Sequence, residues 1–291
     1  MGQPTQFYSH PRTYNDLKFA YPVISRRSRG LSIGLNLNPD KVCNWDCPYC
    51  QVDRTTPSDI TEVDIRGLIS EVRMIVEDAQ SGLLWEHPRF SSTPEYYRRV
   101  RDFALAGDGE PTSFRGFPEV IDRLINLRHD LDINREVSIN VLTNASLFHQ
   151  PHVSEGLALL ANTRSEIWCK LDAGTEEWFQ KVNRSRFSLE HCLNNMQKLA
   201  QKREITIQSL FFVLDGQAPD RTEIATYIER LRWLAMNGGR IHLVQVYTIA
   251  RSPSEAQCTP LPNEAIDAIV SSIRAELPHI DVQGFYGKLP D

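Results

Sequence analysis

The sequence predicts an α/β protein built around a parallel β-sheet, and three observations carry this prediction. Six short β-rich runs follow one another along the chain, segments with helical periodicity separate them, and no linker or internal repeat divides the chain. Parallel neighbours need crossover connections, which are usually helices. The alternation is therefore typical either of an open doubly wound sheet or of a full or partial (β/α) barrel.

The expected strands and helices follow from the spacing of apolar residues. The strands cover 31–37, 103–107, 137–142, 167–172, 205–214 and 241–247, and a weaker seventh strand covers 280–283. Over 61–79 the apolar residues fall mostly on one face, as in an amphipathic helix, and they are Val63, Ile65, Leu68, Ile69, Val72, Ile75 and Val76. The other expected helices cover 118–127, 153–161, 176–182, 189–200, 221–236 and 263–277.

The chain is expected to form one core domain with an N-terminal extension. Residues 1–30 are polar, with a basic patch at 26–29, and should wrap the outside. Residues 31–291 should form the core, which ends in a helix and a short tail. Residues 81–101 are long for a connection within a βα unit and are interpreted as an insertion.

Composition excludes several classes of protein. Apolar residues make up 41% of the 291 residues and charged residues 24%, which is an ordinary globular mixture rather than that of a disordered chain. The net charge of −5 argues against a protein whose main task is to clamp nucleic-acid phosphates. No apolar run reaches the length of a membrane span, and the start lacks the apolar core of a signal peptide, so we expect a cytoplasmic protein.

Three of the six cysteines form a C-x3-C-x2-C motif in the loop after the first expected strand. The motif is Cys43, Cys47 and Cys50. A [4Fe-4S] cluster normally takes four cysteine ligands, so three would leave one iron open to a small molecule. The alternatives are a structural zinc site and a chance grouping of core cysteines. Structural zinc takes four ligands, and the nearest downstream histidine, His87, follows a whole expected helix. The other cysteines stand singly: Cys169 and Cys192 are expected in the core, and Cys258 in a loop where it can be exposed.

With Tyr49 just before its last cysteine, this motif resembles that of the radical S-adenosylmethionine (SAM) superfamily. The resemblance covers roughly residues 31–250 and implies a partial (β/α)6 radical SAM barrel with an N-terminal extension, a [4Fe-4S] cluster and SAM as cofactors. Further motifs fall where the family places them: Gly107-Asp-Gly-Glu-Pro after the second strand, Leu142-Thr-Asn-Ala after the third, Lys170-Leu-Asp and Lys181-Val-Asn-Arg, and Val244-Gln-Val-Tyr. The first has G-D-G-E-P where the commoner form is G-G-E-P.

The resemblance implies roles for these residues. The three motif cysteines ligate the cluster, Tyr49 lies against the adenine, and the backbone of the glycine segment meets the amino group of SAM. The expected cofactor-binding residues are Tyr49, Gly107, Asp108, Gly109, Glu110, Asn140, Asn144, Lys170, Gln245 and Tyr247, and the expected catalytic residues are Lys170 and Asp172.

Alternation along the strands supports part of this set independently. In the fourth expected strand Lys170 and Asp172 share one face, while Cys169 and Leu171 share the apolar face that packs under helices. Charges inside a barrel are costly unless they are paired or meet a ligand. For Gln208 and Gln245, a satisfied interior hydrogen-bond network is an equally good interpretation.

The resemblance implies an enzyme that cleaves SAM reductively to a 5′-deoxyadenosyl radical, which then takes hydrogen from a substrate. A reductase of flavodoxin or ferredoxin type would supply the electron, and the substrate would be a small molecule, a protein or a tRNA. The nearest subgroups are the enzymes of wyosine-type tRNA base synthesis and the activases of glycyl-radical enzymes. The competing interpretation is a non-enzymatic iron–sulfur or zinc module, although an electron carrier normally completes its cluster with a fourth cysteine.

Overall fold

The structure is a computed structural model that describes residues 13–25, 27–133 and 135–287. The start of the expected extension (1–12), Arg26 of the basic patch and the tail at 288–291 lie outside the described residues. The chain divides into two compact units. The first comprises Met1–Cys43, Arg54–Leu142 and Gln150–Glu166, and the second comprises Asn44–Asp53, Thr143–His149 and Ile167–Asp291.

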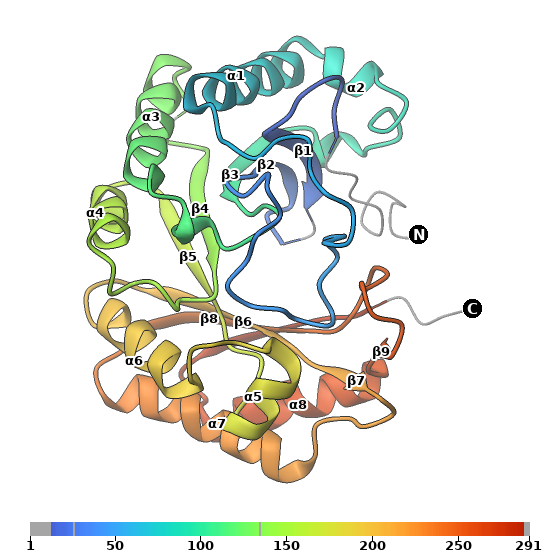
Figure 1. Ribbon diagram of the computed structural model, residues 1–291, viewed down its shortest axis with the longest axis vertical. Coiled ribbons are helices and arrows are strands. Elements are labelled where there is room, and N and C mark those ends of the chain that lie inside the picture. The colour runs from blue at the N-terminus through green and yellow to red at the C-terminus, as the bar shows by residue number, and fades with distance from the viewer. Residues whose placement is uncertain (1–12, 26, 134, 288–291) are drawn as a thin grey trace. The chain divides into compact units, whose positions relative to one another are not determined.

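The first unit contains a sheet with strand order β1-β2-β3-β4, covered on one face by α1, α3 and α4 (Figure 1). β2 pairs in parallel with β3, and β3 with β4, whereas β1 runs antiparallel to β2. The elements are β1 (Ala20–Ser25), β2 (Gly30–Leu35), α1 (Ile65–Ser81), α2 (Leu83–Glu86), η2 (Glu95–Tyr97), β3 (Val100–Leu105), η3 (Pro111–Ser113), α3 (Phe117–Asp130), β4 (Ser138–Thr143), α4 (Pro151–Leu159) and η4 (Leu160–Asn162).

Strand β1 corrects the expectation that residues 1–30 wrap the outside. Ala20, Tyr21 and Ile24 are buried, and the strand pairs along its whole length with β2. Glu71 of α1 helps to hold its start, because its carboxylate accepts hydrogen bonds from the backbone N–H groups of Lys18, Phe19 and Ala20 at 2.8–3.0 Å. The prediction failed because this apolar run is short and lies between polar segments.

The second unit contains a parallel sheet with strand order β5-β6-β8-β10 and a separate two-stranded antiparallel sheet, β7-β9. Its elements are β5 (Ser165–Lys170), α5 (Glu176–Asn183), α6 (Leu189–Ala200), β6 (Ile205–Leu210), β7 (Phe212–Leu214), α7 (Arg221–Met236), β8 (Ile241–Tyr247), β9 (Cys258–Pro260), α8 (Asn263–Glu276) and β10 (Asp281–Phe285). The single strand expected over 205–214 is wrong: it breaks at Phe211, and β7 leaves the main sheet to pair with β9. The expected seventh strand is confirmed as β10.

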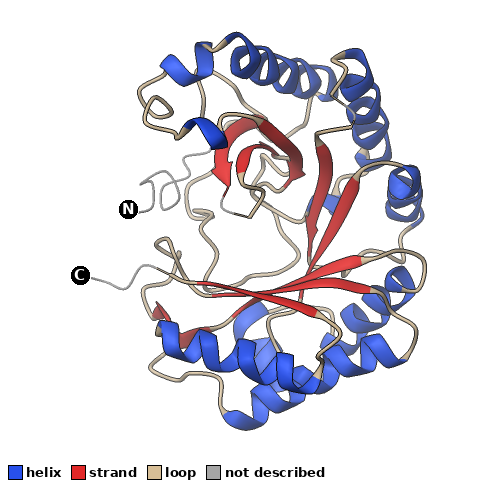
Figure 2. Ribbon diagram, turned by 180° about the vertical axis from the view of Figure 1, so that it is seen from behind, coloured by secondary structure: helices blue, strands red, loops and turns tan. Residues whose placement is uncertain are grey.

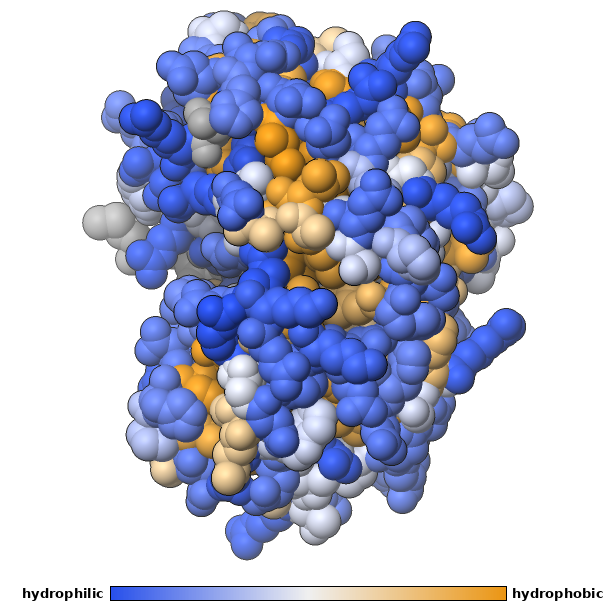
Figure 3. All heavy atoms as spheres, turned by 90° about the vertical axis from the view of Figure 1, so that its left-hand side faces the viewer, coloured by the Kyte–Doolittle hydropathy of each residue, from blue (hydrophilic) through white to orange (hydrophobic). Residues whose placement is uncertain are grey.

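Helices cover the strands within each unit (Figure 2). In α1 the predicted apolar face is confirmed for Leu68, Val72, Ile75 and Val76, which are fully buried. Ile65 and Ile69 are only half-buried, and Val63 lies before the helix. On the face shown in Figure 3, most side chains are hydrophilic. The helix ends at Gly82, whose φ of 96° lies in the left-handed region that glycine adopts without a steric penalty. The predicted α/β class with a parallel sheet is confirmed.

Candidate functional site

The cysteine motif lies on a segment that passes from one unit to the other. Cys43 ends the first stretch of the first unit, whereas Cys47 and Cys50 belong to the second. All three are half-buried thiols outside any disulfide. Within the described ranges, no three His, Cys, Asp or Glu side chains form a group that could hold a metal ion. The convergence of the three sulfurs on a cluster therefore stays a prediction.

The part of this loop in the second unit is anchored by main-chain hydrogen bonds. The N–H of Asp46 donates to the carbonyl of Asn183 at 3.1 Å, and the N–H of Ser254 donates to the carbonyl of Cys50 at 2.6 Å. The carbonyl of Pro48 accepts from the N–H of Glu255 at 3.3 Å and from the hydroxyl of Ser254 at 3.2 Å. Two segments distant in sequence, the end of α5 and the loop before β9, thus fix residues 46–50.

The environment of Cys47 fits a ligand of an iron–sulfur cluster. Burial raises the pKa of this thiol to about 12, which disfavours the thiolate in the absence of a metal. The side-chain amide of Asn183 donates toward its sulfur at 3.6 Å, and N–H donors of this kind are common around cluster sulfurs. With no disulfide and three thiols in one loop, the donor set fits a cluster with three cysteine ligands.

Asp172 lies at the centre of a buried polar network in the second unit. Its carboxylate accepts hydrogen bonds from the hydroxyl of Tyr49 at 2.6 Å, the amide of Asn183 at 3.0 Å and the backbone N–H of Leu210 at 2.8 Å. Lys170 forms an ion pair with it at 3.0 Å. The side chain of Asp172 is fully buried, and these four donors satisfy both of its oxygens.

The predicted placement of Lys170 beside Asp172 is confirmed, with Cys169 and Leu171 buried on the opposite face. The Lys170 ammonium also donates to the hydroxyl of Tyr247 at 2.6 Å. Burial opposes the charge, but the Asp172 carboxylate and Tyr247 outweigh it and raise the pKa of Lys170. Lys170 is therefore a mostly buried ammonium that stays charged at neutral pH, and its catalytic role stays a prediction.

Tyr49 takes part in the same network. Burial and then the Asp172 carboxylate raise the pKa of Tyr49 well above its usual value, so its hydroxyl stays protonated and donates to Asp172. Its ring meets that of Phe212 edge to face, with centroids 5.3 Å apart, and the Lys170 ammonium lies 5.2 Å from its centroid. These contacts fix the ring, while its contact with adenine stays a prediction.

The two glutamines expected in the interior of the second unit form a hydrogen bond with one another. Gln208 and Gln245 are buried on neighbouring strands β6 and β8, and the amide of Gln208 donates to the carbonyl of Gln245 at 2.8 Å. This contact favours the interior network for Gln208. The expected binding role of Gln245 stays a prediction.

In the first unit, the glycine segment after β3 packs against the loop after β2. A Cβ on Gly107 would lie 2.2 Å from the side-chain oxygen of Asn36, and one on Gly109 would lie 2.2 Å from the carbonyl of Val42. The side chain of Asn36 also donates to Asp108 at 2.7 Å and accepts from its N–H at 2.9 Å. Because these two glycines lack a Cβ, the segment from Asn36 to Val42 can pack closely against them. The family resemblance had assigned this close approach to SAM.

Three more expected site residues are buried. Glu110 begins η3 and accepts from the N–H and hydroxyl of Thr112, at 3.2 and 2.6 Å. Asn144, directly after β4, donates to the side chain of Asn44, within the cysteine motif, at 2.7 Å. Asn140 on β4 has a buried side-chain oxygen with no hydrogen-bond partner, and such an acceptor could take a ligand hydroxyl.

The sequence motif at 181–184 included Asn183 without assigning it a role, and Asn36 and Asn38 were not among the expected site residues. Asn38 donates to the hydroxyl of Ser113 at 2.9 Å, within the first unit. The sequence did contain a sign of Asn36 and Asn38, because two amide side chains stand directly between the strand and the cysteine motif. The remaining cysteines lie in the core. The possible exposure of Cys258 is corrected, since it is 3% exposed and burial raises its pKa to about 11.

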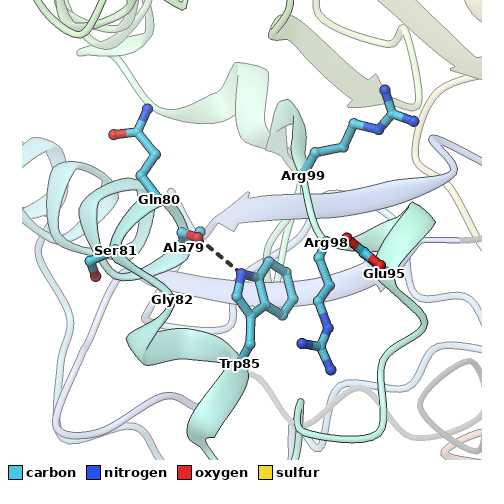
Figure 4. Close-up of a pocket in the computed structure, with 8 residues that line it drawn as sticks. All are labelled: Ala79, Gln80, Ser81, Gly82, Trp85, Glu95, Arg98 and Arg99. Carbon is cyan, nitrogen blue, oxygen red and sulfur yellow. Dashed lines mark hydrogen bonds between the residues drawn. The ribbon is translucent and has the colours of Figure 1, made fainter.

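The insertion at 81–101 carries a groove of about 690 Å³ beside the end of α1 (Figure 4). Trp85 lies in the groove and donates its indole N–H to the carbonyl of Ala79 at 2.9 Å, and the side chains of Arg98 and Arg99 also line it. None of the expected site residues lines this groove. No helix in the described part of the chain is long and apolar enough to cross a membrane.

Comparison with known proteins gives a family match. The model of the radical SAM superfamily matches residues 37–228. A UPF0026 protein of Helicobacter pylori (strain J99) is 29% identical over 139 residues, which are 47% of this chain and 37% of that protein. A UPF0026 protein of Methanocaldococcus jannaschii is 28% identical over 165 residues, 56% of this chain and 43% of that protein. The chain thus covers less than half the length of these relatives.

Solved structures share the fold at low sequence identity. A radical SAM methyltransferase from Sphaerobacter thermophilus has a TM-score of 0.62 at 14% identity, covering 92% of this chain and 69% of that chain. TYW1 with a lysine-pyruvate adduct bound has a TM-score of 0.55 at 16% identity, covering 85% and 74%. Streptococcus suis SuiB bound to SAM has a TM-score of 0.57 at 11% identity, covering 90% and 52%. These likenesses support the predicted radical SAM barrel.

Proposed function

The chain belongs to the radical SAM superfamily, and from this premise we propose that it is an enzyme that cleaves SAM reductively and abstracts hydrogen from a substrate. Cys43, Cys47 and Cys50 would hold a [4Fe-4S] cluster. Bound there, the cluster would supply the electron for the reductive cleavage of SAM. The observation that carries the proposal is the three-thiol loop, whose Cys47 sulfur faces an amide N–H donor.

The chain's own residues would bind and orient the reactants. Lys170 offers a fixed positive charge to the carboxylate of SAM or of the substrate, and Tyr247 holds its ammonium in place. Asn140 offers an unpartnered acceptor for a hydroxyl, such as one of the ribose. Gly107 to Glu110 would receive the amino end of SAM. Asp172, with both oxygens already occupied, would keep Lys170 and Tyr49 in position and exclude water between them.

The test begins with protein reconstituted without oxygen. We expect about four irons and four sulfides per chain, as one cubane requires. Adding SAM to the reduced protein should change its electron-paramagnetic-resonance (EPR) spectrum, because one iron lacks a protein ligand. Dithionite should then release 5′-deoxyadenosine. Bound zinc, or a spectrum unchanged at saturating SAM, would favour the non-enzymatic module.

The substrate is sought among three classes: tRNA, a glycyl-radical protein and small metabolites. Reduced holoenzyme is incubated with SAM and each fraction of a cell extract. The fraction that raises 5′-deoxyadenosine output above the uncoupled rate contains the substrate. Digestion of that fraction with ribonuclease or protease then identifies the class, and a small metabolite survives both treatments. The physiological electron donor, proposed to be of flavodoxin or ferredoxin type, is tested by replacing dithionite with each protein.

A further inference from the structure

One amide nitrogen touches three members of the second unit's polar network. Nδ2 of Asn183 lies 3.6 Å from the sulfur of Cys47, 3.2 Å from the hydroxyl of Tyr49 and 3.0 Å from Oδ2 of Asp172. Asn183 is fully buried. A primary amide has two N–H groups, so three acceptors around one nitrogen leave no hydrogen unused.

The network itself decides which way this amide faces. Rotating the amide by 180° would place its oxygen against the Asp172 carboxylate, and two acceptors would then face each other. Asp172 cannot turn away, because Lys170 and the N–H of Leu210 hold its other oxygen. The nitrogen therefore faces Asp172, and its two N–H groups are shared among Asp172, the Tyr49 hydroxyl and the Cys47 sulfur.

The end of α5 is fixed on the cysteine loop by further contacts. The carbonyl of Asn183 accepts from the N–H of Asp46, within the motif. Arg184, which ends the helix in the left-handed conformation (φ 45°), forms an ion pair with Glu255, and the Glu255 N–H donates to Pro48. Main-chain and side-chain contacts thus hold Asn183 in register with Cys47.

We propose that Asn183 is a positioning residue that orients the Cys47 sulfur and raises the reduction potential of the iron–sulfur cluster. This inference rests on the proposed function, because it requires the cluster. An N–H donor to a ligating sulfur offsets part of the negative charge that the cluster gains on reduction, and hydrogen bonds to sulfur are among the levers that set cluster potentials. Asp172 acts through Asn183 by fixing its amide.

The test compares Asn183→Leu with a matched control, Gln197→Leu. Leucine removes the amide at similar volume. Gln197 is also a buried amide of the second unit, but it donates to the carbonyl of Asn237 at 2.7 Å, away from the cysteine loop. The midpoint potential of each reconstituted protein is measured by EPR-monitored redox titration in the absence of SAM. Circular dichroism verifies the fold, and Asn183→Ala replaces the leucine variant should that one not fold.

We expect the Asn183 variant to bind its cluster and to show about a tenfold shift of the redox equilibrium toward the oxidised form. For a one-electron couple this lowers the midpoint by about 59 mV. The control should keep the wild-type potential. An unchanged potential in a folded Asn183 variant that holds its cluster would overturn the inference. Wild-type protein that holds no four-iron cluster would instead overturn the proposed function.

Discussion

Lys170→Met is the most informative single change in the buried network. Methionine keeps most of the volume of the lysine stem and removes its charge, which separates packing from electrostatics. The ammonium lies 3.0 Å from Oδ1 of Asp172 and 2.6 Å from the hydroxyl of Tyr247. The side chain of Lys170 is 17% exposed and that of Asp172 is 0% exposed, so water screens this pair only weakly.

The size of the effect follows from what Asp172 retains. Removing one partner of a buried ion pair costs about 3–5 kcal/mol when the remaining charge is left uncompensated. Asp172 would still accept from Tyr49, Asn183 and the N–H of Leu210. The loss is therefore closer to one charge-assisted hydrogen bond, about 1.5–3 kcal/mol. We expect the melting temperature to fall by roughly 2–5 °C.

The assay is urea unfolding of Lys170→Met, with Lys181→Met as the control. The control breaks an exposed ion pair between Lys181 and Glu177 on α5. The control should lose at most about 1 kcal/mol.

The raised pKa of Lys170 sets the dependence of stability on pH. The stabilisation is complete below the pKa of an unfolded lysine, about 10.4, and is lost as the pH rises toward the higher folded pKa. The difference between wild type and Lys170→Met should thus be constant from pH 6 to 9 and shrink above about 10.5. Equal losses of unfolding free energy in both variants would refute the ion pair.

In reconstituted protein, Lys170→Met should also weaken SAM or substrate binding about ten- to hundredfold, measured by titration.

Three further outcomes are expected. Alanine in place of Cys43, Cys47 or Cys50 should abolish the cluster, whereas Cys192→Ala should keep it, as iron analysis will show; a full iron complement in a motif variant would contradict the ligand assignment. With SAM and dithionite, any cluster-free motif variant should release no 5′-deoxyadenosine, in contrast to wild type, and release at the wild-type level would contradict the role of the cluster. Burial raises the pKa of Asp102 to about 6. The stability of the wild type should therefore fall as the pH rises from about 4 to 6, by up to about 3 kcal/mol. In Asp102→Asn this dependence of stability on pH should vanish, and a dependence that persists in urea unfolding would belong to another group.

Much of the fold could be predicted because its elements have strong local patterns. The α1 segment shows a clear helical apolar face, and the parallel strands β2 to β6 and β8 are apolar runs between helices. β1 was missed because its pairing with β2 is antiparallel and its apolar run is brief. The break at Phe211 was missed because β6 and β7 are both apolar and only their partners differ.

The candidate site could be predicted only where strand geometry determines neighbours. Residues two apart on one strand share a face, so the pairing of Lys170 with Asp172 followed from alternation. Asn183 lies 136 residues from Cys47 in the chain, and no local pattern reports such a contact. The glycine segment shows a third case: residue type predicted a close approach, but not that the start of the cysteine loop makes it.

The hydrogen-bond partners of Asp172 indicate its role, which its place in the sequence did not determine. Its place beside Lys170 made it a candidate for catalysis or for contact with ribose. A group that transfers a proton or binds a ligand must offer a free oxygen or change its partners during the reaction. Here Lys170, Tyr49, Asn183 and the N–H of Leu210 occupy both oxygens, and these donors come from β5, the cysteine loop, α5 and β6. A residue with this set of contacts is best placed to hold the cysteine loop against the sheet. Asp172→Asn should therefore disturb the Cys47 environment and the cluster potential more than it disturbs SAM affinity, and the redox titration and the SAM titration measure these two effects separately.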